Sequence, residues 1–195
     1  MKKVKTGIVG GAGYTGGELI RLLINHPFIE IDFVHSRSNA GKLVSTVHQD
    51  LVGETELKFT DSLSFGEGQG EVNVLFLCLG HGESKNFLTE NVIDEKIKVI
   101  DLANDFRLAH SSQLKARRFV YGLPELNREQ IKSANNIANP GCFATTIQLG
   151  LLTLAKAELL NDVYTTGITG STGAGQSLSS TSHFSWRANN IQAYK

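Results

Sequence analysis

The chain has 195 residues and a formal net charge of zero, with 19 Lys and Arg against 19 Asp and Glu. This length can bury a sizeable core and could form one large domain or two small ones. The balanced charge argues against nucleic acid and acidic surface partners, and no apolar stretch approaches the length of a membrane span. We therefore expect a soluble, cytoplasmic enzyme. Because the chain enters a predicted strand directly, we expect no signal peptide.

The first part of the chain predicts a strand at 4–9, a glycine-rich turn, and a helix at 18–24 that ends before Pro27. The turn fits the patterns G-x-G-x-x-G and G-x-x-G-x-x-G. Its residues are Gly10, Gly11, Ala12, Gly13, Tyr14, Thr15 and Gly16. Strand, turn and helix in this order are the context that a dinucleotide-binding motif requires, because glycines let the backbone approach a pyrophosphate to which the helix N-terminus donates amides. The alternative is a glycine-rich turn that binds no ligand.

The second predicted strand, at 29–34, indicates which dinucleotide would bind. Sites that prefer NAD usually place an acid about 20 residues past the glycines, on the ribose 2′-hydroxyl. Here the strand is followed by Ser36, Arg37, Ser38 and Lys42, with no acid at its tip. Hydroxyl and cationic groups suit charge-assisted bonds to a 2′-phosphate, so we expect NADP(H). A solvated basic loop is the alternative.

The middle of the chain alternates short apolar runs with helical and turn segments. Runs at 75–79 and 99–103 predict parallel strands covered on both faces, and Cys78 falls in the first run, so we expect it in the core. The other expected elements are a loop at 67–70, a helix at 83–92, a turn-rich segment at 120–125, a helix at 128–134 and a strand at 137–139. This alternation predicts an α/β fold with a Rossmann-type parallel sheet.

Cys142 is the candidate nucleophile. Pro140 and Gly141 predict a sharp turn and the apolar run at 143–160 predicts a helix, so the turn delivers the thiol to a helix N-terminus. Unpaired amides and the helix dipole favour a negative charge there, and the thiolate is the reactive form of cysteine. The alternative is a buried structural cysteine. Two cysteines in such different contexts fit a reduced, cytosolic setting.

The composition changes near Cys142, and we place a domain boundary there, with a dinucleotide-binding domain at 1–141 and the start of a second domain at 142–195. After the predicted helix we expect a strand-like segment at 163–166 and a loop rich in Gly, Thr and Ser through Gly175.

Several motifs of the chain together resemble the N-acetyl-γ-glutamyl-phosphate reductases of arginine biosynthesis, which are relatives of aspartate-semialdehyde dehydrogenase. The motifs occur in one order over nearly the whole chain, which makes the resemblance specific. They are GGAGYTGGEL at 10–19, SRSNAGK at 36–42, GHG at 80–82, DLANDFRL at 101–108, YGLPEL at 121–126 and NPGCFAT at 139–145, and the segment 184–195 is similar as well.

The resemblance implies that NADPH reduces an acyl phosphate to a semialdehyde and that phosphate is released, with Cys142 forming a thioester on the way. It implies that Gly80, His81 and Gly173 lie near the nicotinamide. The segment 142–195 would begin an α+β substrate and dimerisation domain, and the full-length protein would form a dimer or tetramer. The expected ligands are NADP(H) and a small acyl phosphate, with no metal ion, nucleic acid or membrane.

The general base of the reaction is expected outside these residues. The resemblance places a catalytic histidine soon after Lys195, in a longer chain of which the present sequence would be an N-terminal fragment. His183 is the alternative base within the sequence, although a packing or surface role suits it better.

Two further residues are candidates for binding the substrate. Arg107 follows a predicted strand, where α/β proteins collect ligands, and it could hold a phosphate or carboxylate; the alternative is an ion pair with Asp101 or Asp105. Glu125 could orient the substrate or cap a helix. The chain departs from the family pattern in a longer 167–175 loop, in Gln176 where a basic residue is usual, and in Thr153 where proline is common.

Three functions remain open from the sequence. The first is the acyl-phosphate reductase that makes N-acylglutamate semialdehyde, and the second is the same chemistry on aspartate. Tyr14 and Thr15 in the glycine turn and the Asp105–Arg107 motif favour the glutamyl branch. The third is a non-catalytic NADP-binding module.

Overall fold

The computed structural model describes residues 2–63, 72–108, 110–111, 113–114, 117–176 and 179–193, so the loop expected at 67–70 lies outside the described residues. The chain divides into two compact units, Met1–Thr165 and Thr166–Lys195. The first unit contains the sheet and all the long helices. In the described part of the second unit there are three short helical turns.

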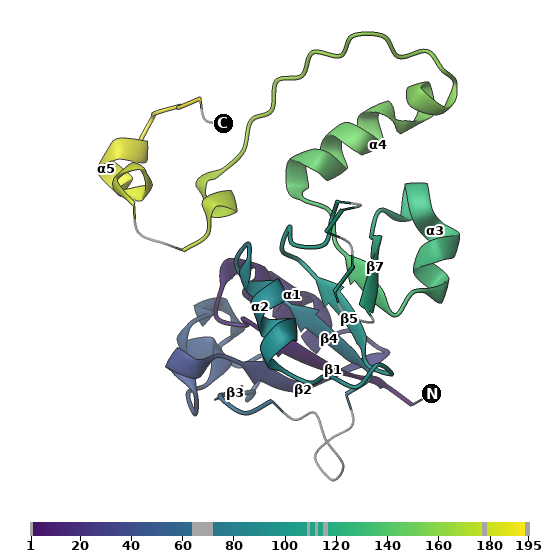
Figure 1. Cartoon of the computed structure of the whole chain (residues 1–195). Coiled ribbons are helices and arrows are strands. Elements are labelled where there is room, and N and C mark those ends of the chain that lie inside the picture. Colours follow the sequence, from purple (N-terminus) through teal and green to yellow (C-terminus); the bar gives the residue numbers. More distant parts are fainter. Residues whose placement is uncertain are drawn as a thin grey trace. The chain divides into compact units, whose positions relative to one another are not determined.

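The first unit is built on an eight-stranded sheet with the order β3-β2-β1-β4-β5-β8-β7-β6 (Figure 1). All neighbouring strands are parallel except β6 and β7. The strands are β1 (Val4–Val9), β2 (Ile29–His35), β3 (Phe59–Thr60), β4 (Val74–Leu77), β5 (Lys98–Asp101), β6 (Gln113–Leu114), β7 (Arg117–Tyr121) and β8 (Asn136–Ala138). The expected α/β fold with a Rossmann-type parallel sheet is confirmed.

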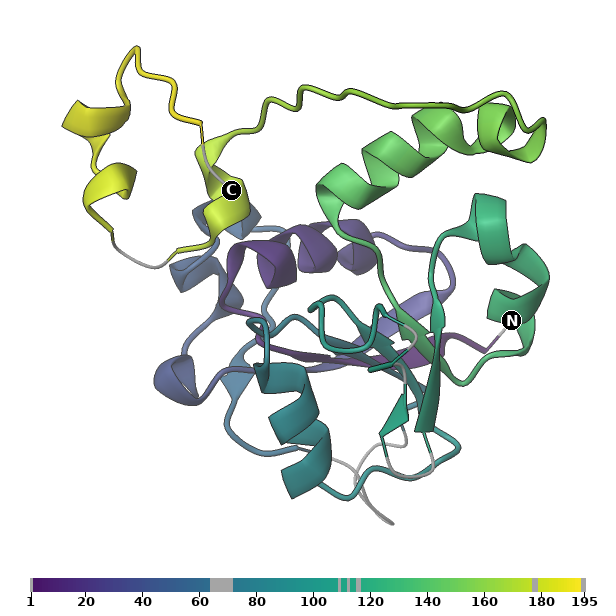
Figure 2. The ribbon, with the colours of Figure 1, turned by 45° about the horizontal axis from the view of Figure 1, so that its top comes forward.

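Among its described residues this unit has four α-helices. They are α1 (Tyr14–Ile24), α2 (Glu83–Glu90), α3 (Pro124–Ser133) and α4 (Cys142–Lys156). Figure 2 shows α1 and α2 on opposite faces of the sheet. Short 3-10 helices, η1 (Arg37–Asn39), η2 (Val44–Thr46) and η3 (Gln49–Leu51), follow β2. A parallel sheet needs cover on both faces, and α1 and α2 provide it around β1 and β4.

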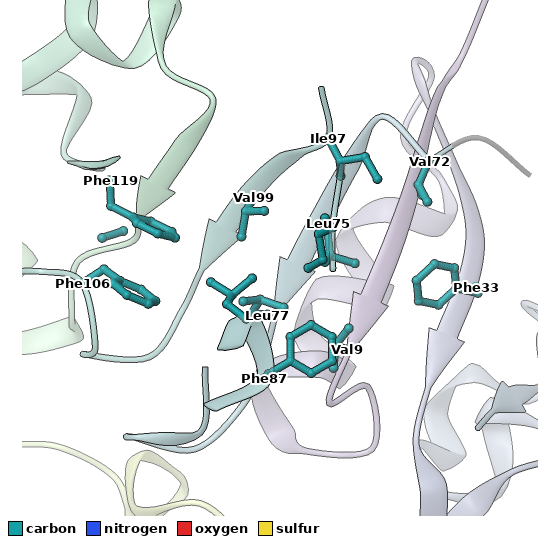
Figure 3. Packing of buried hydrophobic residues seen from close by; sticks show 13 residues of the cluster. Val9, Phe33, Val72, Leu75, Leu77, Phe87, Ile97, Val99, Phe106 and Phe119 are labelled. Carbon is teal, nitrogen blue, oxygen red and sulfur yellow. The ribbon is translucent and has the colours of Figure 1, made fainter. Parts of the chain in front are cut away.

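The alternation of side chains along β1 feeds two separate hydrophobic clusters. Ile8 packs with Ile20 and Leu23 of α1, whereas Val9 belongs to the cluster that includes Phe87 of α2 (Figure 3). Successive residues of a strand point to opposite faces of its sheet. The end of β1, Gly7 to Val9, is accordingly apolar on both faces, whereas Lys5 lies near its more exposed start.

The cluster that contains Val9 and Phe87 extends along the sheet as far as β7 through two aromatic rings. Phe106 and Phe119 stack with ring centroids 4.0 Å apart and an interplanar angle of 5°, and both are buried. Figure 3 shows this pair at the β7 end of the cluster. Phe106 lies in the loop after β5, so the stack ties that loop to the sheet.

The observed elements differ from the sequence-based expectations mainly at their ends. Helix α1 begins at Tyr14 instead of 18, and α3 begins at Pro124 instead of 128. Proline suits the first position of a helix because its missing amide has no partner there. Helix α4 ends at Lys156, short of the expected 160. The expected turn at 120–125 overlaps the end of β7. We did not expect this strand, because it depends on pairing with β8, which comes later in the chain.

The strand expected at 163–166 is absent, and this prediction was wrong. Val163 and Tyr164 are exposed at 44% and 92%, and the segment is assigned to no sheet. β-propensity alone does not make a strand, because a strand needs a neighbour with which to pair. The second unit then contains η4 (Ser171–Ala174), η5 (Ser180–Ser182) and α5 (Phe184–Arg187).

Helix α4 has an unusual surface for so apolar a segment. None of its residues is buried, and Ile147, Leu149 and Leu154 are exposed at 38%, 45% and 44%.

None of the helices in the described part of the chain combines the length and the apolar character that crossing a membrane would need.

Candidate functional site

The candidate residues of the first unit lie around the carboxyl ends of four parallel strands. Gly10 follows β1, Gly80 comes shortly after β4, Leu102 follows β5 and Asn139 follows β8. The strand order reverses between β1 and β4, because β2 and β3 extend to one side of β1 and the later strands to the other. In open α/β sheets ligands bind at such a reversal, outside the carboxyl ends of the strands.

The glycine turn is packed so closely that a side chain at Gly10 or Gly16 would overlap neighbouring backbone atoms. Gly10 has a φ of +80°, and a Cβ there would lie 2.4 Å from the carbonyl oxygen of Cys78. A Cβ on Gly16 would lie 2.6 Å from the Gly10 carbonyl oxygen. At Gly13, the helix N-cap, the nearest atom to such a Cβ is 3.6 Å away. Gly10 and Gly16 therefore fold the turn, whereas the open side of Gly13 leaves room for a ligand to approach.

His48, which the sequence analysis did not select, supports this turn from the side of α1. The Nε2 atom of buried His48 donates a hydrogen bond to the Gly11 carbonyl oxygen over 2.8 Å. The same ring occupies the space beside Gly17, where a Cβ would lie 2.4 Å from it. The ring also packs against Phe59, with centroids 6.5 Å apart. The double glycine at 16–17 was the available signal, since a glycine inside a helix often marks a close approach.

The segment after β2 leaves a cation at the surface. Ser36 is buried, while Arg37 and Ser38 in η1 are exposed. The side-chain amide of Asn39 donates to the Ser36 and Ser38 hydroxyls over 3.3 and 3.2 Å. Burial, together with the charge of Arg37, lowers the pKa of His35 at the end of β2. Arg37 takes part in none of the ion pairs found among the described residues.

The turn between β4 and α2 is held at several points. The Gly80 amide donates to Oε2 of Glu83 over 3.0 Å, and Nδ1 of the exposed His81 accepts from the Asn104 amide over 3.2 Å. The two carboxylate oxygens of Asp105 accept from the Gly82 and Lys85 amides over 2.9 and 3.1 Å. A residue distant in sequence thus caps α2. The sequence analysis treated Asp105 as a possible ion-pair partner of Arg107 and as part of the 105–107 motif, and it did not predict this cap.

Arg107 contacts the ends of two strands. Its Nη2 donates to the Leu102 carbonyl oxygen over 2.7 Å and its Nε to that of Asn139 over 2.8 Å. Its Nη1 lies 2.8 Å from the position that a Cβ on Gly141 would occupy. The ion pairs among the described residues include none between Arg107 and the carboxylates of Asp101 or Asp105. The guanidinium therefore sits beside the turn that carries Cys142.

Cys142 is the first residue of α4 and is exposed. Its N-cap, Gly141, provides no side-chain bond to the helix amides, so the first-turn amides remain directed at whatever lies before the helix. The Gly141 carbonyl oxygen accepts from both the amide and the hydroxyl of Thr145, over 2.8 and 2.9 Å. The other cysteine, Cys78, lies at the end of the buried β4 segment, and burial raises its pKa to about 12.

The buried carboxyl group of Asp101 contacts both the start of α2 and the segment that follows β5. Asp101, at the end of β5, is fully buried, and its Oδ1 accepts from the Ser84 hydroxyl and the Ala103 amide. Its Oδ2 has no hydrogen-bond partner in the described part of the chain. Burial raises the pKa of this carboxyl, and the bonds from Ser84 and Ala103 oppose the rise. A protonated Asp101 avoids the cost of an uncompensated buried charge.

The remaining candidates lie elsewhere. Glu125 is exposed in the first turn of α3, where an acid interacts favourably with the helix dipole. Gly173 lies in η4 of the second unit. His183 is the N-cap of α5, and its Nδ1 accepts from the Ser185 amide over 3.3 Å. No group of three or more His, Cys, Asp and Glu side chains within the described ranges could hold a metal ion.

A hollow of about 620 Å³ lies beside β7 and α3. Its lining includes the stacked Phe106 and Phe119 together with Arg107, Arg118 and Tyr121, but not Cys142. Arg107 thus borders both the hollow and the turn that carries the thiol.

Sequence models of protein families match both parts of the chain. The model described as semialdehyde dehydrogenase, NAD binding domain, matches residues 5–134, and that described as semialdehyde dehydrogenase, dimerisation domain, matches residues 142–195. The chain belongs to the semialdehyde dehydrogenase family. The first match contains the glycine turn and Arg107, and the second begins at Cys142.

Curated relatives within this family share more than half of their aligned residues with the chain. Proteins named N-acetyl-gamma-glutamyl-phosphate reductase are 57% identical in Flavobacterium johnsoniae, 54% in Christiangramia forsetii and 54% in Bacteroides fragilis, each over 193 residues. These alignments cover 98% of this chain and 57–58% of the relatives, so the chain spans little more than half of their length.

Solved structures of similar fold include two aspartate semialdehyde dehydrogenases. The Candida albicans enzyme, solved with NADP, has a TM-score of 0.56 at 18% identity, covering 82% of this chain and 48% of that one. Aspartate semialdehyde dehydrogenase II of Vibrio cholerae has a TM-score of 0.58 at 18% identity, covering 80% and 44%. At this identity the likeness establishes the fold.

The packing of His48 against α1 predicts opposite effects for two glycine-to-alanine changes in helices. Gly17→Ala should lower the free energy of unfolding by about 1–3 kcal/mol, because the new methyl group overlaps a buried ring. Gly150→Ala in α4 is the matched control, since a Cβ there meets nothing within 4 Å, and it should raise stability by up to about 1 kcal/mol through helix propensity. Urea unfolding measures both, and equal stabilisation by the two changes would contradict the packing.

The raised pKa of Asp101 predicts a pH dependence with a definite sign. The folded state binds this proton more tightly than the unfolded state, so the contribution of Asp101 to stability is present at low pH. It is lost as the pH rises from the ordinary aspartate value through the higher folded value. Asp101→Asn cannot ionise, so the stability of the unmodified protein minus that of the variant should fall as the pH rises over this window.

Urea unfolding at a series of pH values measures this difference, and a difference independent of pH would refute the assignment. Asp50→Asn provides a control of opposite sign. The Arg21 guanidinium holds the pKa of Asp50 at about 2, so its contribution should be lost only as the pH falls.

Proposed function

We propose that this chain supplies the cofactor-binding domain and the reactive thiol of an NADPH-dependent reductase. The reaction converts N-acetyl-γ-glutamyl phosphate into N-acetylglutamate 5-semialdehyde and phosphate, in arginine biosynthesis. The observation that carries the proposal is the identity of 53–57% over 98% of the chain to proteins of that name. The exposed thiol beside the cation at the carboxyl edge of the sheet supports the same chemistry.

The residues at the β1–β4 edge fit a dinucleotide. The turn from Gly10 to Gly16 presents backbone and the first amides of α1, and no side chain caps that helix, so an anion such as a pyrophosphate meets donors rather than competing groups. Exposed Arg37, with Ser36 and Ser38 beside it, suits the 2′-phosphate of NADP. The turn of Gly80 and His81 after β4 would border the nicotinamide, and the role of Gly173 near it stays a prediction from the family resemblance.

Cys142 would act as the nucleophile. After a base removes the thiol proton, the thiolate attacks the acyl carbon, a tetrahedral intermediate forms, and the bond from carbon to the phosphate oxygen breaks. Phosphate leaves and a thioester remains, which divides one difficult displacement into two easier steps. The first-turn amides of helix α4, which no side chain caps, would stabilise negative charge that develops beside the thiol during the reaction. The base is expected to be a histidine outside the present sequence.

Arg107 would bind the leaving group. Its guanidinium is positioned by the Leu102 and Asn139 carbonyl oxygens, and its Nη1 is directed toward Gly141 beside the thiol. A fixed cation stabilises negative charge that develops on a phosphate oxygen. NADPH, when bound, supplies the hydride that reduces the thioester. The carbon–sulfur bond then breaks, which frees the aldehyde and regenerates the Cys142 thiolate, and the thiolate can take up a proton again. Glu125 would orient the substrate from the first turn of α3.

The division of the chain into a dinucleotide-binding domain at 1–141 and the start of a substrate domain at 142–195 is part of this proposal. The two family-model matches, which end at 134 and begin at 142, support it. The exposed apolar side chains of α4 and the match to a dimerisation domain support a homo-oligomer of the whole protein. A cytoplasmic location follows from the biosynthetic role proposed.

The reverse reaction tests the function directly. Phosphate-dependent reduction of NADP⁺ with N-acetylglutamate semialdehyde should be measured for this chain and for a chimera that adds the part of the Flavobacterium johnsoniae relative that it does not match. Activity in the chimera alone would place the base in the added part. Inactivity in both forms, or a preference for aspartate semialdehyde, would overturn the proposal.

Cys142→Ser should lower turnover at least 1000-fold, on the order of the loss when a nucleophile is removed, and retain cofactor affinity. Turnover close to the unmodified value would refute the role of the thiol.

The choice of cofactor depends on Arg37. Arg37→Ala should weaken NADPH binding about tenfold or more, as expected for the loss of a charge-assisted bond, and should leave NADH binding within about threefold. Arg128→Ala removes an exposed arginine from α3 and serves as the control. Fluorescence titration measures the affinities, and equal affinity of the unmodified chain for NADPH and NADH would remove the case for a 2′-phosphate site.

A further inference from the structure

The loop after β5 contains a short turn, Asn104 to Arg107, that contacts both the His81 side and the Cys142 side of the candidate site. The Arg107 amide donates to the Asn104 carbonyl oxygen over 3.4 Å, which closes the turn. We call these four residues the 104–107 turn. The proposed function assigns a role only to its last residue.

On one side the turn is bound to the segment before α2. Asp105 uses both carboxylate oxygens, accepting from the Gly82 amide over 2.9 Å and from the Lys85 amide over 3.1 Å. A third bond runs in the opposite sense, from the Asn104 amide to Nδ1 of His81 over 3.2 Å. Three hydrogen bonds with donors on both partners fix the His81 turn more firmly than a helix cap alone would require.

On the other side the same turn is bound to the segment that carries the thiol. Arg107 donates to the Asn139 carbonyl oxygen over 2.8 Å, three residues before Cys142. Its Nη1 fills the space beside Gly141, where a Cβ would lie 2.8 Å away. Gly141 in turn holds the first turn of α4 through its carbonyl oxygen, which accepts from the Thr145 amide over 2.8 Å.

Between these two sides the turn is anchored in the core. Phe106 is 1% exposed and stacks on Phe119 of β7 with centroids 4.0 Å apart. Three successive side chains thus point to three different partners: Asp105 to α2, Phe106 to the core and Arg107 to the thiol segment. A turn with its centre packed in this way cannot shift at one end without disturbing the other.

We propose that the 104–107 turn sets the distance between the His81 turn and Cys142, and that Asp105 is a positioning residue of the reaction. The inference rests on the proposed function, in which the first of these segments borders the nicotinamide and the second carries the thioester. Hydride transfer needs its two carbons in near contact, and a misplacement of about 1 Å costs roughly 100-fold in rate. A carboxylate that touches neither ligand would then control turnover.

Backbone amide exchange on the present chain tests this connection without any need for activity. In Asp105→Ala, exchange of the Gly82 and Lys85 amides should accelerate about tenfold or more, because both lose a charged acceptor. The decisive signals are the Asn139 amide, which donates to the Asp101 carbonyl oxygen, and the Thr145 amide. Both should also accelerate at least threefold, and Arg107→Lys should accelerate Gly82 and Lys85 in the reciprocal manner.

If Asp105 only capped α2, its replacement would change the exchange rates of the amides of residues 82–90 alone. Unchanged exchange at Asn139 and Thr145 would therefore overturn the proposal. Asp94→Ala is the matched control, since Asp94 also accepts a backbone amide, that of Lys96, over 2.8 Å, and it should leave Asn139 and Thr145 unaffected. Asp105→Asn, which retains one acceptor oxygen, should give an intermediate effect and covers the case in which the alanine variant does not fold.

Turnover provides the second readout and separates this inference from the proposed function. In the active form, Asp105→Ala should lower kcat about tenfold to 100-fold and change the KM for NADPH less than threefold, because the positioning rather than the affinity is lost. A raised KM with unchanged kcat would overturn the inference. Activity of the unmodified protein on aspartate semialdehyde alone would refute the proposed substrate, and the same kcat comparison would then be made with that substrate.

Discussion

The common direction of the strands brings most of the candidate groups of the first unit to one edge of the sheet. β1, β4, β5 and β8 are parallel neighbours, so the segments that follow them meet at one edge of the sheet. This arrangement holds only if both faces of the sheet are covered, since a parallel sheet of such apolar strands cannot leave a face in water. Helices α1 and α2 cover the two faces, and their N-termini therefore also point to that edge. The same burial that stabilises the fold brings amides, a cation and a thiol to one side of the molecule.

Close packing at this edge leaves little freedom in the choice of residue. Gly10, Gly16 and Gly17 each lack a side chain because backbone or a buried ring occupies the space that a Cβ would take. His48 turns part of this constraint into support, since the ring that excludes a side chain at Gly17 also donates to the carbonyl of the glycine turn. The turn can therefore keep one shape with its open side free for a ligand.

Three charged side chains of this unit satisfy backbone groups at the ends of strands and helices. Arg107 donates to two carbonyl oxygens that follow β5 and β8, and Asp105 accepts two amides at the start of α2. Arg117 does the same at the beginning of β7, where it donates to the Ile93 and Asp94 carbonyl oxygens and burial lowers its pKa. Short connections leave such groups without helix or sheet partners, and an unpaired buried polar group is costly. Arg107 and Asp105 thus complete the fold at the edge that carries the candidate site, whereas Arg117 does so at the opposite end of β7.

The sequence by itself determined the glycine turn, the strands around it and the thiol at the start of α4, because each depends on local geometry. Gly10 needs a positive φ, apolar runs such as 75–77 need burial on both faces, and Pro140 with Gly141 ends one element and begins the next. Only the tertiary structure decided that His48 supports Gly11, that β7 pairs with β8, and that Asp105 and Arg107 diverge to two different segments. These contacts join residues 20 or more positions apart, except for the short β7–β8 separation, and they depend on how helices and loops close over the sheet. The strand expected at 163–166 shows the same limit from the other side, because a favourable sequence formed no strand where no neighbouring strand was present to pair with it.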